Sequence, residues 1–564
     1  MISISGKIWK QSKVNKNLIE KVKQDHGLGN ILSQLIISRN YDASEIYGIN
    51  NLQKLTNIFK DDCDYKKATK MLLYCIKNNE NICILGDYDV DGACSTSLLV
   101  RYFNHINQKH FFYIPDRIND GYGASKKLFK KLILKKPKLV IMVDCGSTSN
   151  EAIQYLNEHN VKSIIIDHHE INKPYPKSDA VINPKKKITN KEDKLLCATA
   201  LTYFFLDNFI KKMNSDFKLS NYLIYVLLAT VCDVMPLRKI NKIIAHNTLK
   251  NFNLKNNTAL SFIFDQHNIK REITVEDLGF LIGPIINAGG RLNYSKYGVE
   301  LLSSDDHEII KDRSLKLINL NNKRKKIEQN ILNEIDFEKI KSEDKNVIVY
   351  YRNNLNEGLI GIIASRLKDY FNKPSIVITN SNNILKASAR STTTYNIGQL
   401  IKLLIEKKII EKGGGHNMAA GFTIKKDNIN LLDDFIQKDF LKKNSSEKNT
   451  NTYDGEISTS AINLIFMNEI NKLGPFGNFN HLPFFLIRNV KIIKTHIINK
   501  KHVSAIIKSD KGLSLKTISF NCSNNEIGKY LLTYKKKINI IAQIHENNWN
   551  NKKTIQLNIR DLIL

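Results

Sequence analysis

Three apolar segments of the chain each run into acidic side chains. The segments are residues 81–85, 139–143 and 163–166, and the polar residues that follow them are Asp87, Asp89, Asp91, Asp144, Asp167, His168 and His169. One acid after a strand is ordinary turn chemistry, and two histidines could be incidental in a solvated loop. Three such ends together instead favour a bound divalent cation, because carboxylate and imidazole ligands together suit Mn²⁺, Mg²⁺ or Zn²⁺.

The segments that carry these groups have the pattern of buried parallel strands. They are almost entirely Ile, Leu, Val and Met, and residues 150–159 between the second and third have the pattern of a helix. A strand–helix–strand unit makes the sheet parallel, and ligands bind at the carboxyl edge of such sheets. Asp87 and Asp89 are two residues apart and share one side of an extended chain, and we expect Asp91 either to face away from them or to support them from behind.

Further polar groups lie in apolar or glycine-rich surroundings. Asp233 falls in an apolar helix predicted over residues 221–237, where a buried acid needs a partner such as a metal ion. Arg117 lies in a loop bracketed by glycines and is a candidate phosphate clamp, with a structural salt bridge as the alternative. Residues 281–292 are predicted to form a glycine-rich turn that carries Asn287 and Arg291.

A second set of candidate anion ligands lies between residues 387 and 421. Residues 413–421 are predicted to form a glycine nest that opens a helix, which would bind an anion through its backbone amides. The side chains and glycines expected to contact phosphate are Ser388, Arg390, Ser391, Gly414, Gly415 and His416.

The composition limits the number of domains, the cellular compartment and the kinds of partner. The chain has 564 residues, which is too long for one core, and its 42% hydrophobic content is that of a globular protein. No apolar run reaches 18 residues, and eight scattered cysteines without C-x-x-C pairs indicate reduced thiols, so we expect a cytoplasmic protein without a membrane span. The net charge of +30 permits a nucleic-acid partner, but the strong bias toward Lys and Asn makes it undiagnostic.

At this point the motifs resemble a known family. GDYDVDG, VDCG, DHH and ATVCDVMPL occur in the order of the four acidic motifs of the DHH phosphoesterase superfamily. The blocks at residues 113–123 and 283–292 narrow the resemblance to the RecJ-type single-strand-specific exonucleases. The resemblance runs from about residue 80 to the C-terminus.

The resemblance implies a domain order. We expect a helical lead-in (1–64), a parallel-sheet DHH catalytic domain (65–300), a long connecting helix (301–345), a second α/β domain of DHHA1 type (346–441) and an OB-type β-barrel (453–564). Phe484, Phe485 and Trp549 of the barrel are candidates for stacking on bases, with core packing as the alternative.

The resemblance also implies an activity. Two Mg²⁺ or Mn²⁺ ions held by Asp87, Asp89, Asp144, His168 and Asp233 would support 5′-to-3′ hydrolysis of single-stranded DNA to mononucleotides in recombination and repair, with His169 facing the second ion or the phosphate. It implies a monomer that works with single-strand-binding protein and a helicase. The alternatives are a DHH phosphodiesterase of short oligonucleotides and a non-catalytic single-strand-binding scaffold.

Several residues depart from the family pattern. Leu355-Asn356 stands where Trp-His is usual, Lys242 where Arg is usual, and Phe479 where Gly is usual. These departures leave the acids intact, and they bear on substrate affinity and turnover.

Overall fold

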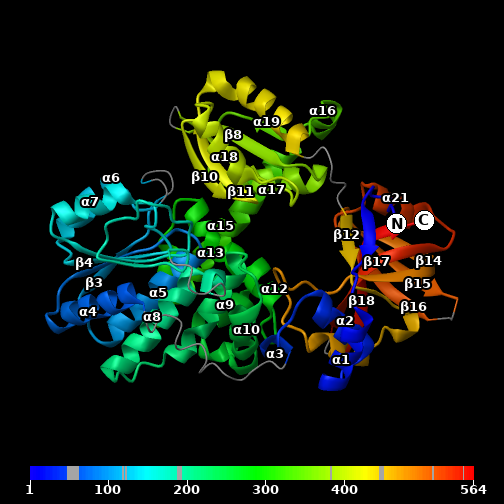
Figure 1. The fold of residues 1–564 in the computed structure, drawn as a ribbon, viewed down its shortest axis with the longest axis horizontal. Helices are drawn as coiled ribbons and strands as arrows, with labels where there is room; N and C mark the ends of the chain where they lie inside the picture. The colour runs from blue at the N-terminus through cyan, green and yellow to red at the C-terminus, as the bar shows by residue number, and fades with distance from the viewer. Residues whose placement is uncertain are drawn as a thin grey trace. The chain divides into compact units, whose positions relative to one another are not determined.

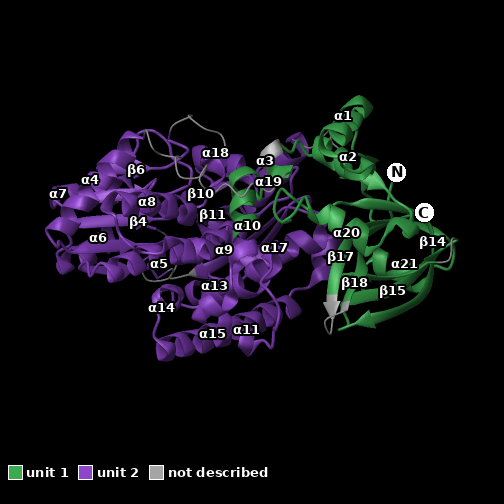
Figure 2. Ribbon diagram, turned by 90° about the horizontal axis from the view of Figure 1, so that it is seen from below, with its two compact units in different colours: residues 1–52, 236–247, 448–564 green, residues 53–235, 248–447 purple. Residues whose placement is uncertain are grey.

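The computed structural model describes residues 1–46, 62–116, 120, 123–186, 193–381, 384–443, 450–510, 513–549 and 552–564. The chain forms two compact units (Figure 2). Unit 1 comprises Met1–Leu52, Pro236–Asn247 and Lys448–Leu564, and unit 2 comprises Gln53–Met235 and Thr248–Glu447.

Unit 2 contains the predicted parallel sheet. Its strand order is β3-β2-β4-β5-β6, with β2 (Ile82–Leu85), β3 (His110–Tyr113), β4 (Leu139–Val143), β5 (Lys162–Ile166) and β6 (Ala180–Ile182). All four strand pairs are parallel, and β2 and β4 are buried along their whole length. This burial on both faces explains the unbroken apolar sequence of these strands.

Helices cover both faces of this sheet (Figure 1). The cluster of Leu128, Phe129 and Ile153 packs α6 (Lys126–Leu132) and α7 (Asn150–Glu158) onto one face. The other helices around this sheet are α4 (Cys63–Lys77), α5 (Val90–His105), α8 (Ala198–Met213) and α9 (Leu223–Cys232).

A helical segment follows the first domain of unit 2. Most of helix α10 (Lys239–Asn251) belongs to unit 1, and the helices that follow in unit 2 are α11 (Thr258–Gln266), α12 (Val275–Asp277), α13 (Gly283–Arg291), α14 (Tyr297–Ser303), α15 (His307–Asn333) and α16 (Phe337–Ser342). Two expectations were wrong here. The predicted turn over residues 281–292 is helix α13, and the single connecting helix is divided between α15 and α16.

The second α/β domain of unit 2 contains a mixed sheet of order β10-β11-β9-β8-β7. Its elements are β7 (Ile348–Tyr351), α17 (Ile360–Phe371), β8 (Ser375–Ser381), β9 (Ile384–Arg390), α18 (Ile397–Glu406), β10 (Lys412–His416), β11 (Ala419–Ile424) and α19 (Ile429–Lys443). The predicted glycine nest is therefore wrong: residues 412–424 form an antiparallel hairpin, in which Gly414 pairs with Gly421. Glycines favour tight hairpins as well as helix starts, and the sequence did not separate the two.

Unit 1 contains a closed barrel. Strands β14 (Phe485–Ile498), β15 (His502–Ser509), β16 (Ser514–Ser519), β18 (Lys552–Ile563) and β17 (Ile538–Trp549) pair in that order, and β17 pairs back with β14. The short strand β13 (Gly455–Glu456) pairs in parallel with the start of β14, and α20 (Leu464–Asn471) and α21 (Glu526–Thr533) complete this part. An OB-type barrel was the expectation, and the closed pairing confirms the architecture.

The N-terminal segment belongs to the same unit as the barrel. Strand β1 (Ile8–Gln11) pairs in parallel with β12 (Thr450–Tyr453), more than 400 residues away in sequence. Helices α1 (Lys16–His26), α2 (Asn30–Ser38) and α3 (Ala43–Ile46) follow, and Leu35 of α2 lies in the core of the barrel. The segment is thus not a purely helical lead-in.

Two further observations bear on the expectations from composition. None of the helices that the structure describes combines the length and the apolar character needed to cross a bilayer. All eight cysteines are unpaired, and most of them are buried, as expected for thiols that act as small apolar groups.

Candidate metal centre

The sheet register brings the acidic strand ends together. Leu85 of β2 lies beside Met142 of β4, and Val143 of β4 lies beside Ile166 of β5. The residues that follow these strands therefore leave the sheet at one edge, from three neighbouring strands. This places Asp87, Asp144 and the Asp167–His169 segment around one point, as the sequence predicted.

The first cluster consists of Asp87, Asp89 and Asp144. One carboxylate oxygen from each lies within 4.8 Å of the others. Asp89 is also the N-cap of α5, where its side chain accepts a hydrogen bond from the amide of Gly92 at 3.1 Å. A Cβ on Gly92 would lie 2.5 Å from the backbone nitrogen of Asp87, so only glycine allows this loop to close.

His168 lies at the centre of the remaining acids. Its Nε2 is 3.3 Å from Asp144 Oδ1, 3.5 Å from Asp233 Oδ2 and 3.7 Å from Asp91 Oδ2. Asp144, His168 and His169 form a second group of potential ligands, and Asp91, His168 and Asp233 form a third. The structure therefore gathers every acid and histidine predicted for the metal site.

Asp91 is held by the start of α8. Its Oδ2 accepts from the amide of Ala198 at 2.8 Å, and its Oδ1 accepts from the amide and the hydroxyl of Thr199 at 2.7 and 2.6 Å. Burial, followed by the charge of Asp89, raises the pKa of Asp91 to about 6. The expected supporting position fits these bonds, although the carboxylate turns toward His168 and not away from the site.

Asp167 anchors the DHH segment. Its Oδ1 accepts from the amides of His168 and His169 and lies 2.8 Å from His169 Nδ1, while its Oδ2 accepts from the amide of Ser147. Burial acts to raise the pKa of Asp167, but the hydrogen bond and charge of His169 outweigh it and hold the pKa well below its usual range. Burial acts to lower the pKa of His169, and its contact with Asp167 instead raises it to about 9.

Asp144 has no such support. It is 1% exposed, and among the residues that the structure describes none donates a hydrogen bond to either of its carboxylate oxygens. Burial, followed by the charges of Asp91, Asp89, Asp87 and Asp233, raises its pKa well above the ordinary value. A buried carboxylate surrounded by others is costly unless a cation compensates it.

His168 supplies the matching nitrogen ligand. Burial, followed by the charge of His169, lowers its pKa to about 3, so the ring is neutral at physiological pH and able to bind a metal. Both ring nitrogens are buried, and neither has a hydrogen-bond partner within the described part of the chain. Unsatisfied carboxylate oxygens beside an unsatisfied imidazole are the groups that Mn²⁺ or Mg²⁺ would take, so the residues present fit such ions.

Helix α13 supports this loop through a close backbone contact. A Cβ on Gly290 would lie 2.2 Å from the carbonyl oxygen of Tyr88, which separates the two acids of the first motif. The glycines that suggested a turn therefore serve close packing of a helix. Asp233 ends α9, and Val234 after it has φ 57°, a left-handed conformation that is rare for a β-branched residue.

The candidate phosphate ligands of the second domain lie on neighbouring strands. Ser388 and Arg390 are on β9, and Arg390 donates from Nη1 to Ser388 Oγ at 3.2 Å and to the Ala389 carbonyl at 2.8 Å. Ser391 is buried, and its hydroxyl donates to the carbonyl of Tyr395. That bond gives Ser391 a local structural contact.

His416 ends β10 and is exposed. Partial burial, followed by the charges of Arg390, Lys185 and His169, lowers its pKa. His416 thus lies within electrostatic reach of both Arg390 and the DHH segment. Gly414 and Gly415 precede it in the hairpin, and Gly415 has φ 158°.

The remaining predicted substrate ligands lie on α13, after β3 in sequence and in the barrel. Arg291 donates from Nη1 to the carbonyl of Gly358 at 2.9 Å, which links α13 to the second domain of unit 2. Asn287 is half-buried on α13. Arg117 lies outside the described residues. Of the barrel aromatics, Phe485 is fully buried in the core, Phe484 packs on Trp9, and the side chain of Trp549 is outside the described ones.

Sequence reasoning missed a polar group at a fourth strand end. Asn183 directly follows β6 and donates to the hydroxyl of Ser147 at 2.8 Å and to the carbonyl of His169 at 3.0 Å. Lys185, two residues later, pairs with Glu170 at 3.0 Å and acts on the pKa of His168. The rule that found the other strand ends would have found this one, had the short β6 been recognised.

Comparison with known proteins gives three family matches. The DHH family, N-terminal domain, matches residues 81–230, the DHHA1 domain matches 344–442, and the RecJ OB domain matches 453–561. Together they cover more than half of the chain, in the order expected from the sequence.

Named relatives agree with these matches. The chain is 27% identical over 571 residues to the single-stranded-DNA-specific exonuclease RecJ of Bacillus subtilis, covering 98% of this chain and 70% of that protein. It is 28% identical over 561 residues to RecJ of Haemophilus influenzae, covering 93% of this chain and 96% of that protein.

The fold is also that of a solved structure. RecJ of Thermus thermophilus in complex with Mn²⁺ superposes with a TM-score of 0.82 at 19% identity, covering 98% of this chain and 79% of that one. The same protein with Mg²⁺ gives a TM-score of 0.75 at 18% identity, covering 99% and 78%. The parallel sheet with its acidic edge, the DHHA1 sheet and the closed OB barrel therefore occur in one chain in a single order, and this protein belongs to the RecJ-type exonucleases of the DHH family.

Proposed function

We propose that this protein is a metal-dependent exonuclease that hydrolyses single-stranded DNA. The carrying observation is Asp144, a buried carboxylate without a hydrogen-bond donor, beside His168, a buried imidazole without one, at the carboxyl edge of a parallel sheet. Its relatives are named single-stranded-DNA-specific exonucleases. A binding scaffold would have no use for so costly a cluster.

We propose that the residues that hold two Mg²⁺ or Mn²⁺ ions are Asp87, Asp89, Asp144, His168 and Asp233. When bound, such ions lower the pKa of a water molecule and neutralise charge on the leaving oxygen. The chain itself orients the ligands. The amides at the start of α8 fix Asp91 behind the site, and Asp167 fixes both histidines.

His169 is the protein group best suited to the phosphate. Its bond to Asp167 orients the ring and raises its pKa to about 9, so at neutral pH it carries a positive charge in the metal-free protein. A charged imidazole beside the centre can hold an anionic phosphodiester and supply a proton. We propose that Arg390 and His416 of the second domain contact the adjacent phosphates, with Asn287 and Arg291 supporting them from α13.

The finer features of the proposal come from family membership. They are 5′-to-3′ polarity, mononucleotide products, a role in recombination and repair, a cytoplasmic monomer, and work alongside single-strand-binding protein and a helicase. We also propose the domain division 65–300, 346–441 and 453–564. The three matched family regions support it, since they lie inside these ranges or exceed them by at most two residues.

The test is hydrolysis of an end-labelled single strand by the full chain with Mn²⁺ or Mg²⁺, beside a matched duplex. We expect mononucleotides from the single strand alone, and no product in EDTA or from Asp144→Asn. Blocking the 5′ or the 3′ end with a bulky group reads the polarity. Binding of the strand without cleavage under both metals would refute the proposal and favour a scaffold.

A further inference from the structure

Lys185 is a cation at the edge of the metal centre to which the proposed chemistry gives no role. Strand β6 pairs in parallel with β5, and Ile182 lies beside Ile166. The chain after β6 therefore leaves the sheet next to the DHH segment, at the edge where the acids gather. Lys185 is the third residue after the end of β6, so its backbone lies at that edge.

A buried asparagine fixes the backbone of Lys185. Asn183 is 6% exposed, and its Nδ2 donates to Ser147 Oγ at 2.8 Å and to the carbonyl of His169 at 3.0 Å. Its Oδ1 accepts from the amide of Lys185 at 2.8 Å, which is the bond of an Asx turn. Asn183 thus ties Lys185 to the loops that follow β4 and β5, so the fold itself sets the place of this lysine.

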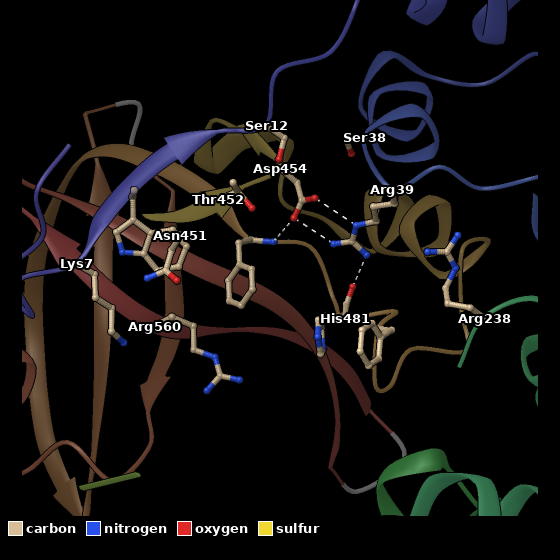
Figure 3. Close-up of a pocket in the computed structure, with 13 residues that line it drawn as sticks. Lys7, Ser12, Ser38, Arg39, Arg238, Asn451, Thr452, Asp454, His481 and Arg560 are labelled. Atoms are coloured by element: carbon tan, nitrogen blue, oxygen red, sulfur yellow. Dashed lines mark hydrogen bonds and ion pairs between the residues drawn. The ribbon is translucent and has the colours of Figure 1, made fainter. Parts of the chain in front are cut away.

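The ion pair that holds the side chain of Lys185 is exposed. Among the described residues, its Nζ pairs with one acid, Glu170, at 3.0 Å, and the two side chains are 27% and 69% exposed. Pairs with this exposure add little to stability. An enclosed pair in unit 1 differs: Arg39 donates from Nε and Nη2 to both carboxylate oxygens of Asp454, and these side chains are only 16% and 10% exposed (Figure 3). Lys185 can therefore leave Glu170 for another anion at little cost.

The charge of Lys185 also acts on the metal centre. Burial, followed by the charges of Asp91 and Asp89, raises the pKa of Asp233. The positive charges of His169 and Lys185 oppose that rise. Lys185 is therefore within electrostatic reach of a proposed metal ligand. When the acids are compensated by bound ions, this lysine is a surplus positive charge beside the site, and such a charge attracts an anion.

We propose that Lys185 is a substrate-binding residue, whose Nζ leaves Glu170 and contacts a non-bridging oxygen of the phosphodiester at the metal centre. The inference rests on the proposed function for the identity of this anion. A lysine suits the role because its ammonium group is a compact charge on a flexible stem, which can change partner while the backbone stays in place. Glu170 is then a competitor of the phosphate and not a stabilising partner.

The test compares variants of the full chain in Mn²⁺, with single-stranded oligo-dT as the substrate. Lys185→Gln should raise KM at least about tenfold and change kcat less than about threefold, because the phosphodiester carries its charge before the reaction as well as during it. Lys185→Arg keeps the charge and should retain most of the affinity. Glu170→Gln removes the competitor and should lower KM by up to about fivefold.

Opposite effects of the two partners separate substrate binding from a structural ion pair. If the pair only stabilised the fold, loss of either side chain would have the same consequence. In the Lys185→Gln background, Glu170→Gln should bring no further gain in affinity. The matched control is Lys162→Gln, because Lys162 begins β5 at the opposite edge of the same sheet and pairs with Asp179 at 2.9 Å. This control should leave KM unchanged.

Binding of a mononucleotide distinguishes failure of this inference from failure of the proposed activity. Thymidine 5′-monophosphate has a phosphate but no phosphodiester, so it binds without being cleaved, and in Mn²⁺ Lys185→Gln should bind it at least about tenfold more weakly than the wild type. Equal affinity of Lys185→Gln and the wild type for this nucleotide, or an equal loss in Lys162→Gln, would overturn the inference. If the nucleotide binds in a Lys185-dependent way but the wild type degrades no DNA, the proposed function alone fails.

Discussion

Replacing Asp144 by asparagine should stabilise the metal-free protein and abolish its response to metal. The side chain is fully enclosed, its oxygens have no donors, and its neighbours are carboxylates. Asparagine keeps the shape and removes the charge. Substitution of a buried polar group usually lowers the free energy of unfolding, but this substitution should raise it, because no hydrogen bond is broken.

The size of the effect follows from the spacing. One oxygen each of Asp87, Asp89 and Asp144 lie within 4.8 Å of one another. Two unit charges at that distance repel by about 3 kcal/mol at an effective dielectric constant of 20. Asp144 faces two such neighbours, but uptake of a proton relieves part of the repulsion. We therefore expect Asp144→Asn to raise the free energy of unfolding by about 1–3 kcal/mol near pH 7.

The pH dependence has a definite sign. The pKa of Asp144 is raised in the folded state, so the folded protein binds this proton more tightly than the unfolded chain. Its contribution then makes the metal-free protein less stable as pH rises from about 4, the ordinary aspartate value, through the raised pKa. Asp144→Asn should lack that slope. Saturating Mn²⁺ should remove the slope from the wild type as well.

The assay is thermal unfolding of the full chain in EDTA and in Mn²⁺. Ligand at one hundred times its dissociation constant adds about 2.7 kcal/mol to a protein that binds it. Asp277→Asn is the matched control, because Arg271 and Thr274 outweigh burial and lower the pKa of Asp277. The control should be destabilised in EDTA and keep its response to Mn²⁺. A less stable Asp144→Asn protein in EDTA, or one that Mn²⁺ stabilises as much as the wild type, would refute this reasoning.

Two further substitutions test the packing. Gly290→Ala should lower metal affinity and the rate of hydrolysis at least about tenfold, because a Cβ would lie 2.2 Å from the Tyr88 carbonyl oxygen. The control is Gly421→Ala, where the nearest atom to a Cβ is 3.7 Å away, and metal titrations and rate assays should show no change in either quantity. Lys242→Met should stabilise unit 1 by about 1–3 kcal/mol at pH 7, measured by hydrogen exchange, because burial lowers the pKa of Lys242 to about 8 over the ring of Tyr41. Wild-type stability should rise between pH 8 and 10.5, the variant's should not, and a parallel rise in both would contradict this assignment.

The parallel sheet and its acids could be predicted because strands that are buried on both faces have a continuous apolar sequence. Strands β2 and β4 are apolar on both faces and β5 ends in three isoleucines, so each was recognisable, and the residue after each strand lies at the sheet edge by geometry alone. The strand β6 has three residues and lacks that signal, so Asn183 was missed. The site residues were predicted correctly where the strand that precedes them could be recognised from its apolar sequence.

Glycine-rich segments were assigned wrongly for one shared reason. Glycine permits a turn, a helix start or a close backbone contact, and only the partner decides which. In α13 the partner of Gly290 is the Tyr88 carbonyl, and in the β10–β11 hairpin Gly414 faces Gly421. Strand β1 was missed because its partner, β12, is more than 400 residues away. Local pattern contains no information on such pairings.

The roles of the buried acids follow from their hydrogen-bond donors, which no sequence displays. Asp91 and Asp167 are each held by backbone amides, which fix the position of both carboxylates. Asp144 is equally buried among the same neighbours and receives no donor. Among these three acids, each 1% exposed, backbone amides donated to Asp91 and Asp167 but not to Asp144 separate the supporting carboxylates from the one left for a cation. By this criterion Asp91 is a supporting carboxylate, even though its Oδ2 lies 3.7 Å from His168 Nε2. Substitution of Thr199, which donates to Asp91 Oδ1, should therefore change the position of Asp91, whereas removal of a metal ion should not.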